Sequence, residues 1–126
     1  MARSVLEGIA YNLKSAYDVL NNRTELSSQL LLVGGGAQSS IFRQIYSDVF
    51  EIEMIKTNVM QDAASLGAAA LAAVGCGFWD NYNVIKKVHE NISITKPIRR
   101  NCEKYRELYQ RYLKVCEAQA KISDMI

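Results

Sequence analysis

The sequence predicts an α/β fold in which helices surround two parallel strands of an incomplete sheet. A short apolar run at 30–33 leads through a glycine turn into a helical pattern, and a second strand pattern follows at 51–57. The other helical patterns carry one apolar face each. Two strands do not form a stable sheet by themselves. We therefore expect missing strands, supplied by residues absent from this chain or by another chain.

The first predicted element is a helix from Val5 to Leu20, because apolar residues recur there every three or four positions. Ser4 followed by Glu7 indicates a capping box at its start. The pair of asparagines after Leu20 ends it.

A strand, a helix and a second strand follow. The run 30–33 is too short for a helix and lacks polar alternation, which is typical of a strand covered on both faces. Ser39 or Ser40 can cap the helix that follows, and its apolar positions repeat every four residues over 41–49. A strand, a helix and a strand within about 30 residues form a βαβ unit, which leaves the two strands parallel.

An alanine-rich helix is predicted over 62–75. Ala63, Gly67, Ala70 and Val74 form a stripe of small side chains along it. Such a stripe lets a helix approach a neighbouring backbone or a ligand closely. Plain close packing of this helix against a sheet is the alternative.

The C-terminal part is predicted to contain a short helix capped by Asp80, a loop with Pro97, and a long helix from about Cys102 to Ala120. One face of the long helix is aromatic, which favours a docking face over a ligand site. The residues of this face are Tyr105, Leu108, Tyr109, Tyr112 and Cys116.

Composition excludes several function classes. The chain has 126 residues, 49% of them hydrophobic, which is enough for one core. Its 15 basic and 13 acidic residues form no block of one sign, so charge alone predicts neither nucleic acid nor a membrane as a partner. Cys76, Cys102, Cys116 and the single His89 fit neither a disulfide framework nor a zinc site, and indicate free, mostly packed thiols. With no signal or membrane segment in view, we expect a cytoplasmic protein.

The glycine turn is the candidate functional feature. Three glycines between a strand and a helix place bare backbone N–H groups at the carboxyl edge of the sheet, where phosphates and nucleotides are commonly held. The turn matches neither a P-loop nor the spaced glycines of a dinucleotide fold, and a tight turn without a ligand is the alternative. No catalytic set accompanies it. Asp48 and Asp62 are the nearest carboxylates, and each is better explained as a helix-end residue.

The order of motifs resembles a known family. "LLLVGGGAQSSIFRQIYSDVF", then "EIEMIKT", then "QDAASLGAAALAAVGCGFW" resembles the last third of the FGGY family of carbohydrate kinases, and the xylulokinase-like branch most. Helices matching "LEGIAYNLKSAYDVL" and "YRELYQRYL" extend the resemblance over nearly the whole chain. It implies a partial ribonuclease H-like domain of the actin-like ATPase type, with two parallel strands, about four to five helices and an incomplete sheet.

The resemblance also implies an activity. FGGY kinases transfer a phosphoryl group from ATP, with Mg²⁺, to a sugar or polyol hydroxyl in a cleft between two actin-like domains, and a pentulose such as xylulose is the favoured substrate here. In relatives the aspartate base, most sugar contacts and the Gly-Thr phosphate loop lie upstream of the matching segment. Residues 1–126 are therefore expected to be the C-terminal portion of the second, nucleotide-side domain, inactive alone.

The resemblance assigns the glycine turn to the adenine and ribose pocket. In relatives the residue three or four positions beyond the last glycine, often an asparagine, touches the base; here this is Ser39 or Ser40, and Gln38 is a substitute with a longer reach. Gln44 and Asp48 match the helix pattern of the family and are expected to be structural. The expected nucleotide-binding residues are Gly34, Gly35, Gly36, Ala37, Gln38, Ser39 and Ser40.

Two other hypotheses remain. The chain could be a non-catalytic helical module that self-associates through Tyr105, Tyr109 and Tyr112 of its last helix, which would make it a homo-oligomer. A piece of a dinucleotide-binding oxidoreductase is disfavoured, because Glu51 and Glu53 lie too close to the glycines to bind a ribose in the usual way.

Overall fold

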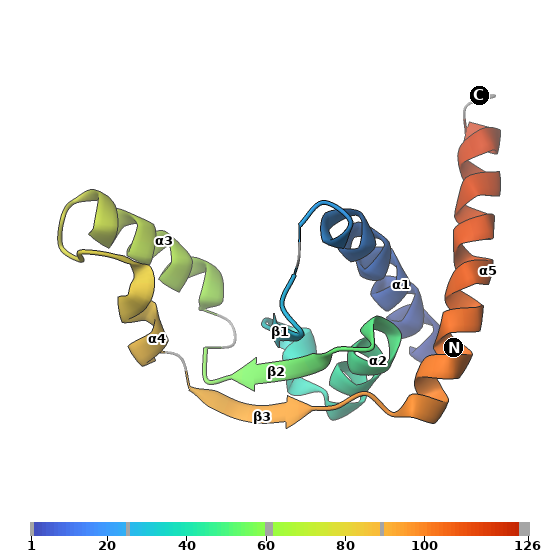
Figure 1. The fold of residues 1–126 in the computed structure, drawn as a ribbon, viewed down its shortest axis with the longest axis horizontal. Helices are drawn as coiled ribbons and strands as arrows, with labels where there is room; N and C mark the ends of the chain where they lie inside the picture. Colours follow the sequence, from blue (N-terminus) through green and yellow to red (C-terminus); the bar gives the residue numbers. More distant parts are fainter. Residues whose placement is uncertain (1, 25, 60–61, 89, 124–126) are drawn as a thin grey trace.

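The computed structural model describes residues 2–24, 26–59, 62–88 and 90–123. The fold is α/β, as the sequence predicts, with helices gathered around a small sheet (Figure 1). In chain order the elements are α1 (Ala2–Asn21), β1 (Gln29–Leu32), the 3₁₀ turn η1 (Gly35–Gln38), α2 (Ser40–Phe50), β2 (Glu53–Thr57), α3 (Ala63–Gly75), the 3₁₀ turn η2 (Tyr82–Val84), α4 (Ile85–Val88), β3 (Asn91–Thr95) and α5 (Arg99–Ser123).

The sheet is mixed. β1 and β2 pair in parallel, with Leu30 opposite Met54, which confirms the predicted βαβ pairing. β3 pairs antiparallel with the other edge of β2, and the sequence analysis missed this strand. Residues 91–95 alternate polar and apolar side chains, which is a strand pattern.

One face of β1 is half-buried against the core, and its other face is exposed. The burial of its four residues alternates between exposed and half-buried, and Leu31 is 55% exposed. The prediction of a strand covered on both faces is therefore wrong within the described chain. Next to β1 lies an open apolar groove of about 310 Å³. Its lining residues are Leu13, Ala16, Tyr17, Leu20, Leu30, Leu31, Leu32, Tyr46, Phe50 and Met54. This open side fits the expectation of an incomplete sheet.

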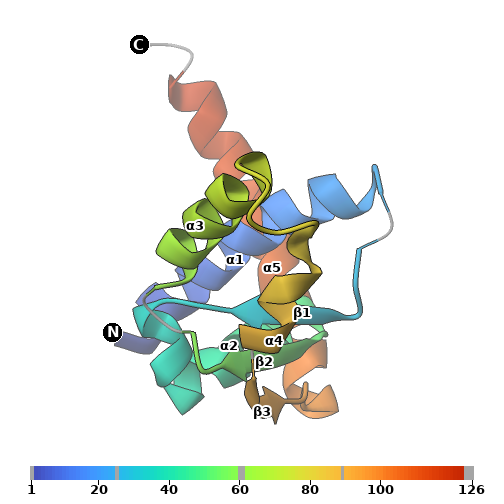
Figure 2. The same cartoon turned by 90° about the vertical axis from the view of Figure 1, so that its left-hand side faces the viewer.

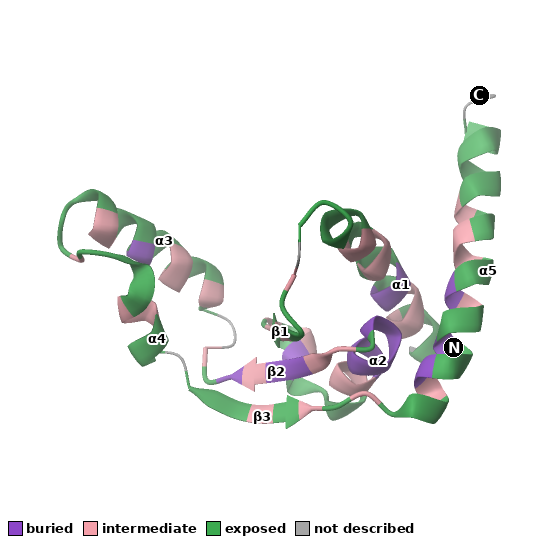
Figure 3. Ribbon diagram, in the orientation of Figure 1, coloured by how far each residue is buried: buried purple, intermediate pink, exposed green. Residues whose placement is uncertain are grey.

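The core lies where α1, α2 and α5 meet the sheet. α2 contacts α1, α5 and β2, and every residue from Ile45 to Phe50 is buried. Figure 3 shows the buried positions concentrated in α2, β2 and the first half of α5. The buried hydrophobic cluster comprises Ala10, Tyr11, Ile45, Tyr46, Val49, Phe50, Met54, Tyr105 and Tyr109.

The aromatic face of α5 packs inside the chain. Tyr105 and Tyr109 are buried, and their ring centroids lie 6.2 and 5.9 Å from that of Tyr11 in α1. The ring of Tyr112 lies 5.4 Å from Tyr11. The face is a docking face, as predicted, and its partner is α1. Two of the three tyrosines proposed for self-association are thus covered by the chain itself.

The ends of α1 and α5 differ from the predicted ones. α1 begins at Ala2, so Ser4 lies inside the helix and the predicted capping box is wrong. Glu7 instead accepts a hydrogen bond from the hydroxyl of Tyr105 at 2.8 Å. α5 begins earlier than predicted, at Arg99, because the carbonyl of Ile98 already accepts the first helical hydrogen bonds.

α3 and α4 form a separate lobe beyond the ends of the strands, away from α1 and α5 (Figures 1 and 2). Ala70 is the one buried residue that α3 contributes among the described residues. The space beside Gly67 is open, so the described chain does not use the predicted small stripe for close backbone contact. Phe78, in the turn after α3, is 87% exposed.

The cap in this lobe differs from the predicted one. Asn81, and not Asp80, caps η2: the Asn81 side chain accepts a hydrogen bond from the backbone N–H of Asn83 at 2.9 Å. An asparagine one position later fills the same role, because both side chains offer an oxygen to the first free N–H groups.

The cysteines are unpaired, as predicted, but only one is buried: Cys102 is buried, Cys116 is half-buried and Cys76 is exposed. His89 lies outside the described residues. Across the described part of the chain, no helix has the length and apolar character needed to cross a membrane.

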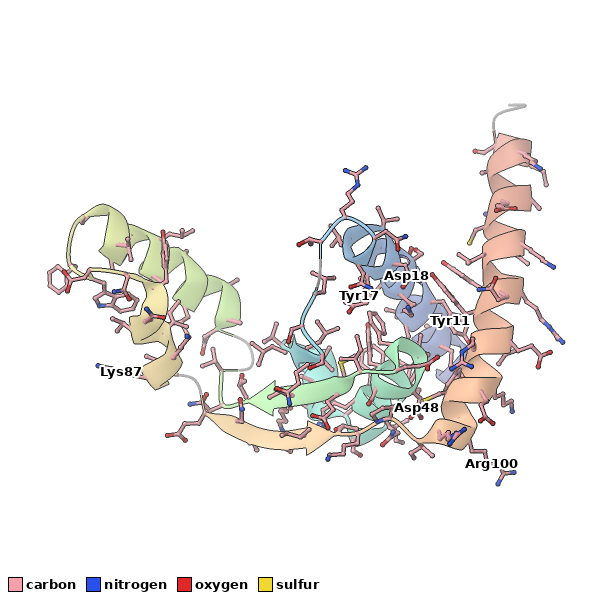
Figure 4. The ribbon with its side chains drawn as sticks, in the orientation of Figure 1. Tyr11, Tyr17, Asp18, Asp48, Lys87 and Arg100 are labelled. Carbon is pink, nitrogen blue, oxygen red and sulfur yellow. The ribbon has the colours of Figure 1, made fainter. Side chains whose placement is uncertain are left out.

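Asp48 ties α2 to the start of α5. The carboxylate is 1% exposed, and Figure 4 shows it between the two helices. Its Oδ1 accepts from the N–H of Ile98 and from Gln44 Nε2, both at 2.8 Å, and its Oδ2 accepts from Asn101 Nδ2 at 2.7 Å. All three donors belong to the protein, so this carboxylate is structural, as expected.

Replacing Asp48 should destabilise the fold. In Asp48→Asn the amide N–H₂ faces at least one of these three donors, which leaves buried N–H groups unpaired at a cost of about 2–3 kcal/mol. Urea unfolding followed by circular dichroism measures the loss. The control is Asp62→Asn, because the exposed Asp62 makes no capping hydrogen bond and its loss should stay within about 0.5 kcal/mol. Equal midpoints for both variants would contradict this role of Asp48.

Removing the hydroxyl group should lower the stability of the protein at Tyr109 but not at Tyr11. The Tyr11 hydroxyl is buried and has no hydrogen-bond partner within the described ranges, whereas Tyr109 donates to Asp18 Oδ2 at 3.0 Å. Tyr109→Phe should cost about 1 kcal/mol, and Tyr11→Phe should be neutral or stabilising. Denaturant unfolding at neutral pH compares the two.

The buried hydroxyl of Tyr11 makes the stability of the folded state depend on pH. Burial, aided by the charge of Glu7, raises the pKa of Tyr11 from 10.0 to about 12. Because the folded state favours the neutral phenol, the stabilisation is complete below pH 10.0 and is lost as the pH rises through about 12. Ultraviolet titration of tyrosinate should lose a step near pH 12 in Tyr11→Phe; an unchanged titration curve would contradict the assignment.

Candidate functional site

The glycine corner, residues 34–40, joins β1 to α2. Because β1 and β2 are parallel, their carboxyl ends lie at the same edge of the sheet, and the corner lies at this edge. The 3₁₀ turn η1 occupies its centre. The seven residues predicted for nucleotide binding form this turn and the start of α2: Gly34, Gly35, Gly36, Ala37, Gln38, Ser39 and Ser40.

The first glycine is required by its backbone conformation. Gly34 has φ 85° and ψ −175°, a combination that side chains with a Cβ rarely adopt. A Cβ at Gly34 or Gly35 would meet no atom within 4 Å. The two residues therefore present open main chain, and neighbouring side chains do not fill the space beside them.

The third glycine is required by a close contact. A Cβ on Gly36 would lie 2.4 Å from Cε1 and 2.5 Å from Cδ1 of Phe42. The Phe42 ring is itself held by an edge contact with Tyr46, with 4.5 Å between the ring centroids. Phe42 therefore packs from the α2 side against the main chain of the corner, and only a glycine fits between them.

Ala37 and Ser39 hold the turn in shape. Ala37 is 0% exposed, its N–H donates to the carbonyl of Gly34 at 3.1 Å, and its carbonyl accepts from Arg43 Nη1. The hydroxyl of Ser39 accepts from the N–H of Phe42 at 3.3 Å as the cap of α2. The Ala37 methyl and the Ser39 hydroxyl are thus already in use by the fold.

Polar groups that face solvent remain at the corner. Gln38 and Ser40 are exposed, and of the two predicted serines, Ser40 is the one not engaged as a cap. In the part of the chain that the structure describes, the backbone N–H groups of Gly35 and Gly36 have no hydrogen-bond partner. The corner therefore combines open main chain, two free N–H donors and two exposed polar side chains, which suits a flat, polar ligand.

Two residues that matter here were not found by sequence reasoning. Phe42 and Arg43 were treated only as part of the helical pattern that follows the glycines. In the structure both reach back to the corner from the first turn of α2. Side chains in a first helical turn point towards the N-terminus of the helix, and this is the signal that could have identified them.

The described residues contain no metal centre. No group of three or more His, Cys, Asp or Glu side chains within them is arranged to hold a metal ion. Mg²⁺ is expected for the full-length kinase, and no residue of this chain was predicted to bind it.

Comparison with known proteins decides the family. Residues 1–76 match the family model "FGGY family of carbohydrate kinases, C-terminal domain". The chain belongs to the FGGY family of carbohydrate kinases. It is 34% identical over 128 residues to a xylulose kinase from Lactococcus lactis, which covers 99% of this chain and 25% of the relative. The resemblance inferred from the motifs is thereby confirmed.

Solved structures of FGGY kinases agree. The xylulose kinase from Lactobacillus acidophilus superposes with a TM-score of 0.82 at 26% identity, covering 95% of this chain and 24% of that one. Plasmodium falciparum glycerol kinase with ADP superposes with a TM-score of 0.67 at 26% identity, covering 92% of this chain and 23% of that one. The chain thus spans about a quarter of the length of the kinases that it matches.

The three glycines should differ in their tolerance of alanine. Gly34→Ala should cost about 1–2 kcal/mol because of its positive φ, whereas Gly35→Ala should be neutral. Gly36→Ala should be destabilising through the clash with Phe42, and Phe42→Leu in the same chain should recover part of the loss. Thermal unfolding of the four variants tests this order. Equal melting temperatures for the Gly34 and Gly35 variants would contradict the geometry of the corner.

Proposed function

We propose that this chain is the nucleotide-side portion of a kinase that transfers a phosphoryl group from ATP to a hydroxyl of a sugar or polyol, with a pentulose such as xylulose as the favoured substrate. In this proposal residues 1–126 form the C-terminal portion of the second actin-like domain. The observation that carries it is the open main chain at Gly34 and Gly35, at the carboxyl edge of the parallel strands, in a chain of the FGGY family.

The corner suits adenosine better than it suits a sugar. A purine is flat and apolar on its faces, so it can lie against main chain that carries no side chains, with the exposed Gln38 and Ser40 beside it for polar contacts. The unpartnered N–H groups of Gly35 and Gly36, within the described part of the chain, can donate to a ribose or phosphate oxygen. The solved glycerol kinase with ADP that superposes on this chain supports a nucleotide as the ligand.

The chemical step needs groups that this chain does not bring to the corner. A base must take the proton from the attacking hydroxyl. Asp48, the carboxylate nearest in sequence, is occupied by three donors of the protein. In the proposal the base, the sugar contacts and the phosphate loop come from the remaining three quarters of the kinase length, and the chain by itself is inactive.

The favoured substrate rests on the relatives. The xylulose kinases of Lactococcus lactis and Lactobacillus acidophilus are similar to this chain, and this supports a pentulose. Gluconate and glycerol kinases are also among the structures that superpose. The choice of sugar is made by residues outside this chain.

Self-association through α5 is the weaker hypothesis. Tyr105 and Tyr109 are covered by α1, so they cannot form the centre of an interface without unfolding the core. The apolar groove beside β1 is instead the surface expected to meet the rest of the kinase.

Calorimetric titration with ADP tests the proposal. Gly35→Val should weaken ADP binding roughly tenfold or more, which corresponds to about 1.4 kcal/mol, because the side chain occupies the space of the base. Its melting temperature should hold, since Gly35 is exposed and has open space around it. Gly8→Val in α1, where the space is also open, is the matched control and should bind ADP as the unchanged chain does. No ADP heat from the unchanged chain at millimolar concentration, or equal affinity in both variants, would overturn the proposal.

A further inference from the structure

We propose that Arg43 is a positioning residue that holds the glycine corner in the shape that receives a nucleotide. This inference rests on the proposed function. Arg43 lies in the first turn of α2, and its Nη1 donates to the carbonyl of Ala37 in η1. The contact joins the helix to the corner, and the space beside Gly34 and Gly35 stays open.

Charge pairing does not explain the position of this side chain. Four other arginines of the described ranges form ion pairs with glutamates: Arg3 with Glu7, Arg99 with Glu103, Arg106 with Glu51, and Arg111 with Glu107. Arg43 instead donates to a neutral main-chain oxygen. Its Nε is buried and has no hydrogen-bond partner among the described residues. The guanidinium group of Arg43 is thus half-buried, and the carbonyl of Ala37 is its hydrogen-bond acceptor.

That carbonyl needs a donor. Ala37 is fully buried, and η1 ends one residue later, so no following helical N–H satisfies its oxygen. A buried carbonyl without a partner is unfavourable, and the turn would rotate it towards water if Arg43 were removed. Arg43 therefore fixes the orientation of the peptide group between Ala37 and Gln38.

The orientation of this peptide group also determines that of the Gln38 N–H. A trans peptide is planar, so the Ala37 carbonyl and the Gln38 N–H move as one unit. Gln38 is one of the exposed polar residues beside the open glycines. On the other side, Phe42 packs against Gly36. The two adjacent residues of α2 thus hold the corner at two points, one polar and one apolar, and leave its outer side open.

A purely structural role predicts a different outcome from a positioning role. If Arg43 only stabilised α2, its loss would lower the melting temperature and leave ADP affinity per folded molecule unchanged. If it positions the corner, its loss raises the dissociation constant for ADP and speeds amide exchange in residues 36–40, while exchange in α5 stays the same.

The experiment compares Arg43→Met and Arg43→Lys in the full chain by NMR, with Arg111→Met as the matched control. Arg111 is exposed and pairs with Glu107 on the far part of α5. In Arg43→Met we expect amide exchange at residues 36–40 to rise roughly tenfold and the dissociation constant for ADP to rise roughly tenfold. Arg43→Lys should recover part of both changes, because an ammonium group can still donate to one carbonyl. Arg111→Met should change neither.

Several results would overturn the inference. Unchanged exchange at residues 36–40 in Arg43→Met would show that the contact does not hold the corner. Faster exchange with unchanged ADP affinity would make Arg43 structural only. If the unchanged chain binds no ADP while exchange still rises in Arg43→Met, the proposed function fails and with it the nucleotide role, whereas the hold of Arg43 on the turn stands. Circular dichroism melting of each variant excludes global unfolding as the cause.

Discussion

The parallel pairing of β1 with β2 is the constraint on which the rest of the molecule depends. Two parallel neighbours need a crossover, and α2 supplies it by packing its buried half against the sheet. The crossover must begin at the carboxyl end of β1, in the short space between the strand and the helix. Three glycines make this turn narrow enough, and the same absence of side chains leaves main chain exposed at the edge of the sheet.

α2 also connects the sheet to the start of α5 and to the glycine corner. Its buried face binds the start of α5 through Asp48, while Phe42 and Arg43 in its first turn hold the corner. One helix therefore connects the long C-terminal helix, the sheet and the candidate site. Next to β1, residues of α1, α2 and both parallel strands line an open apolar groove, and the chain spans about a quarter of the length of the kinase on which it superposes.

Features that depend on neighbouring residues could be predicted from the sequence. The glycine turn, a serine cap at Ser39 or Ser40 and the periodicity of α2 follow from neighbouring residues; the structure has all three, with Ser39 as the cap. The motif order was specific enough to indicate the family. Caps were less predictable, because one extra turn of α1 moved Ser4 into the helix, and Asn81 competes with Asp80 for the same role.

Contacts over long sequence separations could not be predicted. The antiparallel partner of β2 comes from residues 91–95, whose alternation is typical of a strand but does not say which strand they pair with. The donors to Asp48 lie some fifty positions away, at Ile98 and Asn101. The open side of the sheet and the exposed lobe of α3 and α4 are features of tertiary structure, and no local pattern encodes them.

The central claim is that the open main chain of the glycine corner receives the adenine ring. Nuclear Overhauser effects between adenine protons and the protein, recorded with saturating ADP, test it most directly. The account predicts contacts from the adenine H2 or H8 proton to the α-protons of Gly34 and Gly35. Adenine contacts confined to the apolar groove beside β1, or none at the corner at saturation, would contradict it.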